Sequence, residues 1–136
     1  MGNDSLYVLL ADDDLDDCLF FKDALEEINA EIVVSFEHDG SKLMYFLTQP
    51  QNRLPNIIFI DINMPIKNGI ECLKEIRANK RFNGLILVIY STSDSEHDIH
   101  EAFVHGANIY IKKPNNFLDL KASLANAISR SVHTIH

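Results

Sequence analysis

The 136-residue chain has few cysteines, little positive charge and no long apolar run. Because a membrane-spanning helix needs about 20 apolar residues and the polar start MGNDS is no secretory signal, we expect a cytoplasmic protein without membrane insertion. The formal net charge of −8 argues against direct nucleic-acid binding, which requires a basic surface. The two cysteines, Cys18 and Cys72, are not in a ligand spacing, so we expect buried free thiols in a reducing compartment.

The remaining composition is ordinary for one globular domain: 46% of residues are hydrophobic and 24% are charged. Short apolar segments alternate with segments of helical periodicity. The pattern predicts strands at Leu6–Ala11, Ile32–Phe36, Ile57–Ile60, Leu85–Tyr90 and Ile109–Ile111. It predicts helices at Leu15–Ile28, Ser41–Leu47, Ile70–Ala78 and Glu96–His105, and a last helix that begins near the N-cap Asn116.

This alternation is typical of an α/β protein with a parallel sheet covered by helices on both faces. The first helix is expected to bury Leu15, Leu19, Ala24, Leu25 and Ile28. The last helix is expected to bury Phe117, Leu120, Leu124, Ile128 and Val132. In such sheets ligands bind at the carboxyl ends of the strands.

Acidic residues stand at two of these strand ends. Asp12, Asp13 and Asp14 follow the first strand, and Asp61 follows the third. An ionised carboxylate at a strand end costs stability unless it is paired or bound to a metal. If the two strands are neighbours, their carboxylates converge, and oxygen ligands of this kind suit Mg²⁺. The sequence therefore predicts a divalent cation site at this edge.

Hydroxyl and amino groups follow two further strands. Ser91 and Ser93 come after the fourth strand, and Lys113 and Pro114 come after the fifth. The combination suggests phosphoryl transfer to a carboxylate. Asp61 would attack in line while the metal and the Lys113 ammonium neutralise charge on the phosphoryl oxygens, and Ser91 would donate a hydrogen bond.

The segment Asp61–Gly69, with the sequence DINMPIKNG, carries a family resemblance. Together with the separations of 30 residues from Asp61 to Ser91 and 22 from Ser91 to Lys113, it resembles the receiver domain of two-component response regulators. The resemblance covers about residues 6–132. Within the family, the chain is similar to chemotaxis receivers and to stand-alone receivers that serve phytochrome-type histidine kinases. Ser91 stands where Thr is commoner in the family.

The resemblance implies a flavodoxin-like three-layer fold, with five parallel strands in the order 2-1-3-4-5 and five helices. Asp61 would be the phosphoacceptor. Asp12 and Asp13, together with Asp61 and the backbone carbonyl of Asn63, would hold Mg²⁺ or Mn²⁺.

Further roles follow from the same resemblance. Lys113 and Ser91 would contact the phosphoryl group, and Tyr110 would be the aromatic switch that moves with Ser91. Pro114 would be a cis proline. The residues that tune the lifetime of the phosphoryl group would be Asn63 and Ser93.

The implied protein is a single receiver domain over residues 1–136 without an output domain. It would not be an enzyme, although it would assist its own phosphorylation and dephosphorylation. The phosphoryl donor would be a sensor histidine kinase or a phosphotransfer protein, and the output would be an altered protein–protein contact. A role as phosphorelay intermediate is the alternative within this family.

Other classes fit the sequence less well. A flavodoxin-like FMN carrier would need a Ser/Thr-rich phosphate loop after the first strand, where this chain has three aspartates. A receiver-like scaffold that has lost phosphorylation is disfavoured because every required side-chain type is present. His97, Glu101 and His105 share one helical face, which we interpret as a solvated or partner-facing surface.

Overall fold

Five short parallel strands form the centre of the protein, in a computed structural model that describes residues 5–135. We expected that the polar start MGNDS is not a secretory signal, and most of this segment lies outside the described residues. The strand order is β2-β1-β3-β4-β5, as the resemblance implied. The strands are β1 (Tyr7–Ala11), β2 (Val33–Glu37), β3 (Ile57–Ile60), β4 (Ile86–Ser91) and β5 (Ile109–Lys112).

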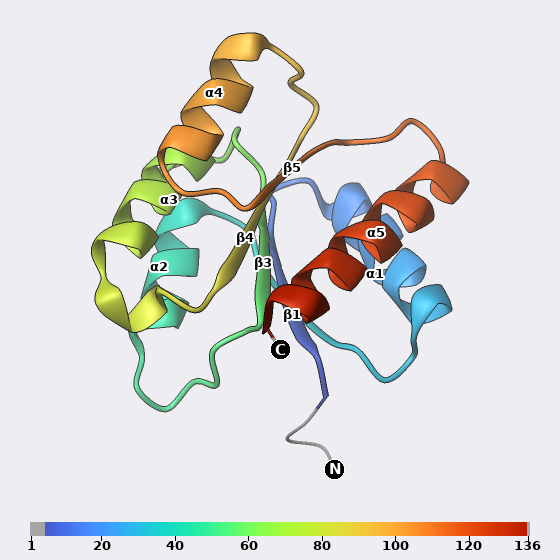
Figure 1. Ribbon diagram of the computed structural model, residues 1–136, viewed down its shortest axis with the longest axis horizontal. Coiled ribbons are helices and arrows are strands. Elements are labelled where there is room, and N and C mark those ends of the chain that lie inside the picture. The colour runs from blue at the N-terminus through green and yellow to red at the C-terminus, as the bar shows by residue number, and fades with distance from the viewer. Residues whose placement is uncertain (1–4, 136) are drawn as a thin grey trace.

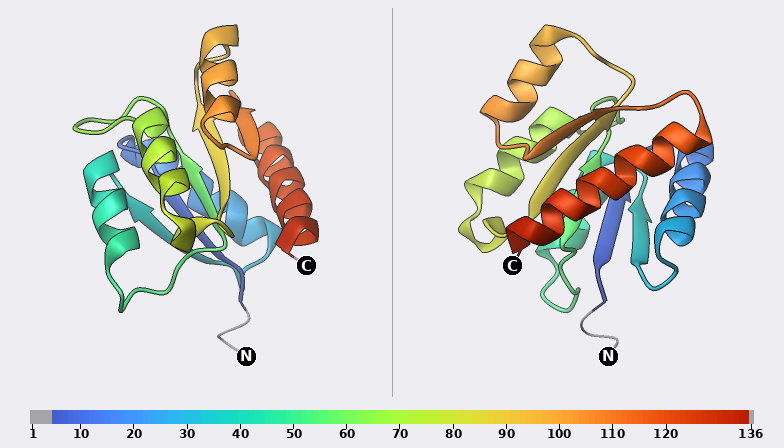
Figure 2. Two further views of the ribbon diagram at one scale, coloured as in Figure 1. Left: turned by 60° about the vertical axis from the view of Figure 1, so that its left-hand side comes forward. Right: turned by 45° about the vertical axis from the view of Figure 1, so that its right-hand side comes forward.

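Helices cover both faces of this sheet. Figure 1 and the rotated views of Figure 2 show α1 and α5 on one face and α2, α3 and α4 on the other. Their bounds are α1 (Leu15–Ile28), α2 (Gly40–Thr48), α3 (Gly69–Ala78), α4 (Glu96–Val104) and α5 (Phe117–Ile135), with a short 3-10 turn, η2, at Lys80–Phe82. The predicted elements are thus confirmed, and no predicted end differs from the observed one by more than one residue. Over the described residues, no helix is both long and apolar enough to cross a membrane.

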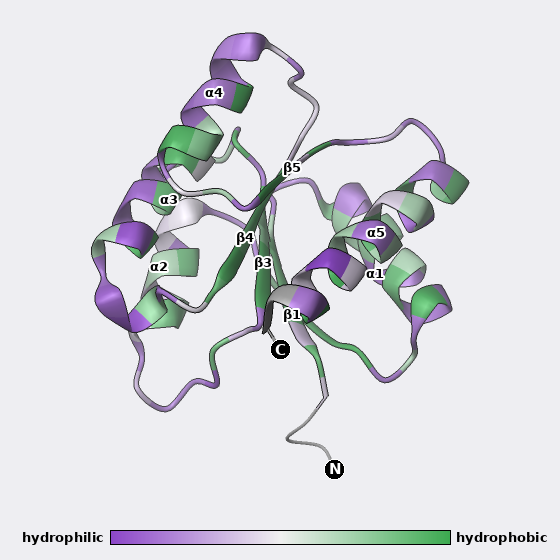
Figure 3. Cartoon of the chain, viewed as in Figure 1, coloured by the Kyte–Doolittle hydropathy of each residue, from purple (hydrophilic) through white to green (hydrophobic). Residues whose placement is uncertain are grey.

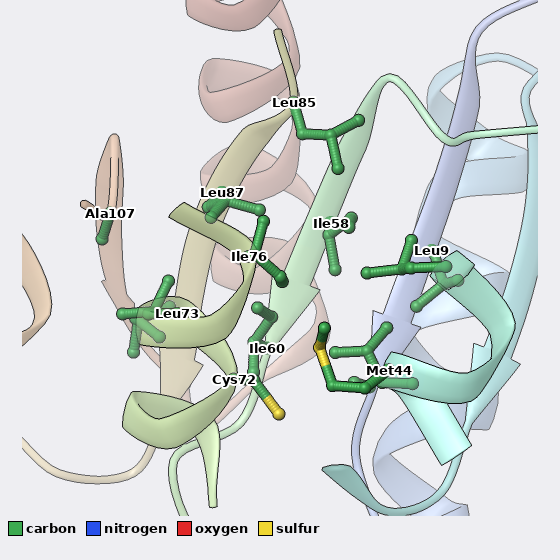
Figure 4. Packing of buried hydrophobic residues seen from close by; sticks show 14 of the residues in the cluster. Leu9, Met44, Ile58, Ile60, Cys72, Leu73, Ile76, Leu85, Leu87 and Ala107 are labelled. Carbon is green, nitrogen blue, oxygen red and sulfur yellow. The ribbon is translucent and has the colours of Figure 1, made fainter. Parts of the chain in front are cut away.

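The three inner strands explain the continuous apolar runs of the sequence. Every residue of β1, β3 and β4 is buried, because each of these strands has a covered face on both sides. Figure 3 shows these strands as the most hydrophobic part of the chain. Figure 4 shows the core on the α2–α3 side, where Leu9, Ile58 and Leu87 from the sheet pack with Leu73 and Ile76 of α3.

The buried face predicted for α1 is partly wrong. Leu15 and Leu19 are 63% and 62% exposed, whereas Cys18 and Phe21 are buried in their place. The helix is rotated so that Phe21 makes edge contacts with the rings of Phe59 and Tyr90 at centroid distances of 5.0 and 5.7 Å. Burying a large aromatic side chain against the sheet stabilises the fold more than burying either leucine would. Consequently two leucines of α1 face solvent.

The expected buried stripe of α5, its N-cap and the burial of both free thiols are confirmed. Leu120, Leu124 and Ile128 of α5 are buried, and both ends of the predicted stripe are partly buried against the same core. The Asn116 Oδ1 atom accepts a hydrogen bond from the Asp119 backbone amide at 2.9 Å, so it caps α5 as predicted. Both cysteines are buried and free.

Candidate functional site

The register of β1 and β3 brings the predicted acids together. Ala11 is paired with Ile60, and the Asp61 amide donates a hydrogen bond to the Ala11 carbonyl at 2.9 Å. The next residue of each strand is an aspartate, so Asp12 and Asp61 are neighbours at the carboxyl edge. Oxygen atoms of Asp12, Asp13 and Asp61 all lie within 4.8 Å of one another.

Burial strongly perturbs two of these carboxyl groups. Asp12 is fully buried and Asp61 is 6% exposed, whereas Asp13 is exposed. Burial raises the pKa of Asp61 to about 6, and the nearby Asp12 charge adds to the shift while the Lys113 ammonium opposes it. Burial likewise raises the pKa of Asp12, with Lys113 again opposing. Two desolvated acids side by side are costly unless a cation is close.

The donor set fits a hard divalent cation. Three carboxylates from two adjacent strand ends supply oxygen ligands, which Mg²⁺ and Mn²⁺ accept, and exposed Asp13 leaves the site open to water. The amide of Asn63 donates a hydrogen bond to Asp61 Oδ1 at 3.4 Å, which holds this loop beside Asp61. The ligand role of the Asn63 carbonyl stays a prediction.

Lys113 places an ammonium group among the acids. Its backbone amide donates to the Ser91 carbonyl at 2.7 Å, which fixes the residue directly after β5. Its Nζ atom lies 2.8 Å from Asp12 Oδ2 and 3.5 Å from Asp61 Oδ2. Burial alone would lower the pKa of Lys113, but its hydrogen bonds to two aspartates raise that pKa above its ordinary value. The side chain is therefore a firmly charged, buried cation beside Asp61.

Sequence reasoning missed a fourth acid, Asp17. Its Oδ2 atom lies 2.7 Å from Lys113 Nζ, closer than the oxygen of Asp61. Asp17 belongs to the first turn of α1, and helical side chains point back toward the helix N-terminus, in this case toward the site. The signal was present in the sequence, since Asp17 lies about one helical turn after the strand-end acids.

The predicted switch residues lie along β4 and β5. Ser91 is fully buried at the end of β4, and its Oγ atom accepts a hydrogen bond from the Ser93 amide at 3.2 Å. The half-buried Tyr110 donates its hydroxyl hydrogen bond to the Ser93 carbonyl at 2.7 Å. Ser93 Oγ donates to Asp98 Oδ2 at 2.5 Å, which links the β4–α4 loop to α4. The switch and tuning roles of these residues stay predictions.

The expected cis proline is not present. The peptide bond before Pro114 is trans. The trans form is favoured by about 0.5–1 kcal/mol for an X–Pro bond even without tertiary contacts. Because Lys113 reaches its acidic partners with this bond trans, the placement of the ammonium group does not depend on a cis isomer.

The segment Met64–Gly69 shapes the loop that follows Asp61. The Gly69 amide donates to the Ile62 carbonyl at 2.9 Å, and α3 begins at this residue. A Cβ atom at Gly69 would collide with the backbone of Asp61, so only glycine allows the start of α3 to lie this close. Met64 is buried, whereas Ile66 is 80% exposed with φ of 70°. The segment thus packs its methionine inward and projects its isoleucine outward.

The chain is similar to known signalling proteins. Residues 8–125 match the family model described as the response regulator receiver domain. Response regulator Rcp1 of Synechocystis sp. is 30% identical over 123 residues, which cover 88% of this chain and 84% of that protein. The probable methanogenesis regulatory protein FilR2 of Methanothrix harundinacea is 26% identical over 126 residues, which cover 90% of this chain and 81% of that protein.

Solved structures give the same result. The phosphorylated cyanobacterial phytochrome response regulator RcpA superposes with a TM-score of 0.88 at 27% identity, covering 96% of each chain. The Mn²⁺-bound form of response regulator Rcp1 has a TM-score of 0.83 at 28% identity, covering 91% of this chain and 92% of the other. With the strand order, the strand-end acids and the family match in agreement, this chain belongs to the response regulator receiver domain family.

Proposed function

We propose that this chain is a single-domain response regulator that accepts a phosphoryl group on Asp61 from a histidine kinase or phosphotransfer protein. The observation that carries the proposal is the placement of the Lys113 ammonium 3.5 Å from Asp61 Oδ2, beside a cluster of three carboxylates. This arrangement supplies a nucleophile, a phosphate ligand and a cation site at one edge. The phosphorylated and Mn²⁺-bound forms of its structural neighbours support the proposal.

The transfer step needs little covalent chemistry from the protein. A carboxylate oxygen of Asp61 forms a bond to phosphorus as the bond from phosphorus to the histidine nitrogen of the donor breaks, and the imidazole leaves with the electron pair and takes up a proton. Lys113 contacts a phosphoryl oxygen, and Ser91 donates its hydroxyl to another. A bound Mg²⁺, held by Asp12, Asp13 and Asp61, supplies charge neutralisation on the phosphoryl oxygens.

The perturbed pKa of Asp61 suits this role. With a pKa of about 6, the carboxyl group is mainly ionised at neutral pH and is therefore nucleophilic. Its burial leaves it poorly solvated, so little water has to be displaced when the donor arrives. Cation binding would lower this raised pKa and keep the acceptor ionised.

The output would be a change of protein contacts. Phosphorylation adds about −2 charge at Asp61, to which Ser91 and Lys113 are attracted. The β4–α4 loop, held by the hydrogen bond between Tyr110 and Ser93, would then change its packing, and the α4–β5–α5 face with it. The neighbours named as phytochrome and red-light response regulators support a photoreceptor kinase as one donor. The protein would act in the cytoplasm, either as the final regulator or as a phosphorelay intermediate.

Labelling by acetyl phosphate with Mg²⁺ tests the proposal. Asp61→Asn removes the nucleophile and should abolish labelling. Asp14→Asn is the matched control, because Asn caps α1 as well as Asp14 does while it removes a nearby charge. The control should be labelled at the wild-type rate. Full labelling of Asp61→Asn would overturn the assignment of the acceptor.

A further inference from the structure

Asp17 is an acid at the site that neither the sequence pattern nor the transfer chemistry uses. The Asp17 Oδ2 atom lies 2.7 Å from Lys113 Nζ, and the Lys113 side chain is 9% exposed. Asp17 is carried by α1 and Lys113 by the β5–α5 connection, so the contact joins residues 96 positions apart in the chain. The Asp17 side chain is 31% exposed and therefore lies at the mouth of the site.

The Lys113 ammonium group has three N–H donors, and its three carboxylate partners are not equivalent. Asp17 and Asp12 lie at 2.7 and 2.8 Å, whereas Asp61 is at 3.5 Å. The two short contacts hold the ammonium, and the acceptor receives the longest and weakest one. In the unphosphorylated protein, Lys113 is thus bound mainly by acids that are not the acceptor.

Phosphorylation must change this balance. If Asp12 takes part in cation binding, its oxygen turns from Lys113 to the metal, and Asp17 remains as the competing carboxylate. Lys113 then reaches a phosphoryl oxygen on Asp61 only to the extent that Asp17 releases it. An acceptor–lysine contact that forms only on phosphorylation stabilises that state relative to the resting one, and a competing partner subtracts from it.

We propose that Asp17 is a positioning residue that tethers Lys113 in the unphosphorylated protein and so opposes phosphorylation of Asp61. The inference deepens the function proposed above and rests on it. The tether lowers the population in which the ammonium is free to contact the phosphoryl group. Asp17 thereby sets how readily the site takes up a phosphoryl group without touching that group itself.

The alternative is that Asp17 acts only through its charge at the start of α1, where acids stabilise the helix dipole. Asp16 is the matched control for this alternative. It lies in the same helical turn, carries the same charge and is exposed, and the structure shows no ion pair between it and Lys113. A pure charge effect would make Asp16→Asn and Asp17→Asn equivalent.

Phosphorylation rates with acetyl phosphate and Mg²⁺ should separate the two roles. Asp17→Asn should raise the rate about threefold to fivefold, the upper part of the range for losing one partly exposed ion pair, whereas Asp16→Asn should change it less than twofold. The affinity for beryllofluoride, a phosphoryl mimic, should rise in parallel. Asp17→Glu, which restores the carboxylate, should return the rate toward that of the wild type. Thermal unfolding of each variant, measured alongside, establishes whether it is folded, and only folded variants are compared.

Each outcome decides the question. Equal rates for the two asparagine variants, or a slower Asp17→Asn, would overturn the tether while the proposed function stands, provided that the wild type is labelled on Asp61. A wild type that is never labelled on Asp61 would overturn both. A specific increase for Asp17→Asn that the glutamate variant reverses supports the tether, because a merely structural role predicts no gain in rate.

Discussion

Two largely buried cations, one at each end of the sheet, show how differently the two ends are built. At the carboxyl end, Lys113 is surrounded by the carboxylates of Asp12, Asp17 and Asp61. At the amino end, the guanidinium of Arg77 donates to neutral oxygens. Its acceptors are the carbonyls of Phe82, Leu85 and Gly106 and the Oδ1 atom of Asn108, at 2.9 to 3.3 Å.

The two cations differ in the chemistry of their partners, and this difference bears on what each end of the sheet can do. Carboxylates that hold a lysine also attract metal ions and repel one another, so their arrangement changes when a cation or a phosphoryl group arrives. Backbone carbonyls are fixed by the loops that carry them, so Arg77 joins the connections before β4 and β5 without a competing ligand. Gly106, with φ of 108°, lies directly against the Arg77 side chain and leaves room for it. The carboxyl end is therefore the end that we propose to switch, whereas Arg77 holds two connections of the fold together at the amino end.

The largest expected effects come from removing each of the two cations in turn. Lys113→Ala should slow phosphorylation by about 100-fold, the usual loss when one charged ligand of the transition state is removed. Arg77→Ala should lower the free energy of unfolding by about 3 kcal/mol, because three partly buried carbonyls lose a charged donor. Labelling by acetyl phosphate and urea unfolding measure the two effects.

Lys113→Ala and Arg77→Ala should differ in which property they lose, the rate of phosphorylation or the stability of the fold. Arg77→Ala, assayed where it is folded, should be phosphorylated within about twofold of the wild-type rate, since it lies at the opposite end of the sheet. A strong loss of phosphorylation in Arg77→Ala at full folding would contradict the division between the two ends.

A smaller effect concerns the free-energy cost of burying the ionised Asp61 carboxylate. The pKa of Asp61 is higher in the folded protein than in the unfolded chain, so the folded state binds the proton more tightly and loses stability as pH rises from about 4 to 6. Asp61→Asn removes this cost. In metal-free buffer, the variant should be more stable by on the order of 2 kcal/mol above pH 7 and should show no gain below pH 4. Urea unfolding across this pH range measures the difference, and a gain that does not depend on pH would refute this explanation.

Metal addition should act on the carboxyl end alone. At a concentration ten times its dissociation constant, Mg²⁺ should stabilise the protein by about 1.4 kcal/mol, which raises Tm by about 5 °C for a chain of this size. Asp13→Ala should lose most of this rise, whereas Arg77→Ala should keep it in full. Thermal unfolding with Mg²⁺ and with EDTA gives both values, and an unchanged rise in Asp13→Ala would remove Asp13 from the cation site.

The smallest expected effect tests whether one added carboxylate is enough to make the amino end respond to Mg²⁺. Asn108→Asp gives Arg77 a carboxylate partner and keeps the oxygen that accepts from the Leu87 amide at 2.8 Å. Because one partly exposed ion pair contributes little, stability should change by less than about 1 kcal/mol. Mg²⁺ should stabilise this variant as it does the wild type. A new magnesium response at the amino end would show that the comparison overstates the role of the clustered acids.

Much of the fold and the core of the site could be predicted because their signals are local. Strand-end acids such as Asp12 and Asp61 are visible in the sequence, and a parallel sheet brings them to one edge. The buried face of α1 was harder, because apolar residues surround this helix and only contacts from the sheet decide that Phe21 is buried and Leu19 is exposed.

Long-range contacts explain what sequence reasoning missed. The partner of Asp17 is 96 residues away, and its identity depends on how α1 lies against the β5–α5 connection. Arg77 likewise meets acceptors from two separate connections, the one before β4 and the one before β5. The trans bond at Pro114 was missed for another reason, because the family pattern suggested an isomer that the placement of Lys113 does not require.

The sharpest test of Asp61 as the phosphoacceptor is to map the phosphoryl group by mass spectrometry after incubation with acetyl phosphate and Mg²⁺. We expect one phosphoryl group on the peptide that contains Asp61, lost on treatment with hydroxylamine as an acyl phosphate is, and absent when EDTA replaces Mg²⁺. A phosphoryl group on any other residue, or none on Asp61 when Mg²⁺ is bound, would contradict it.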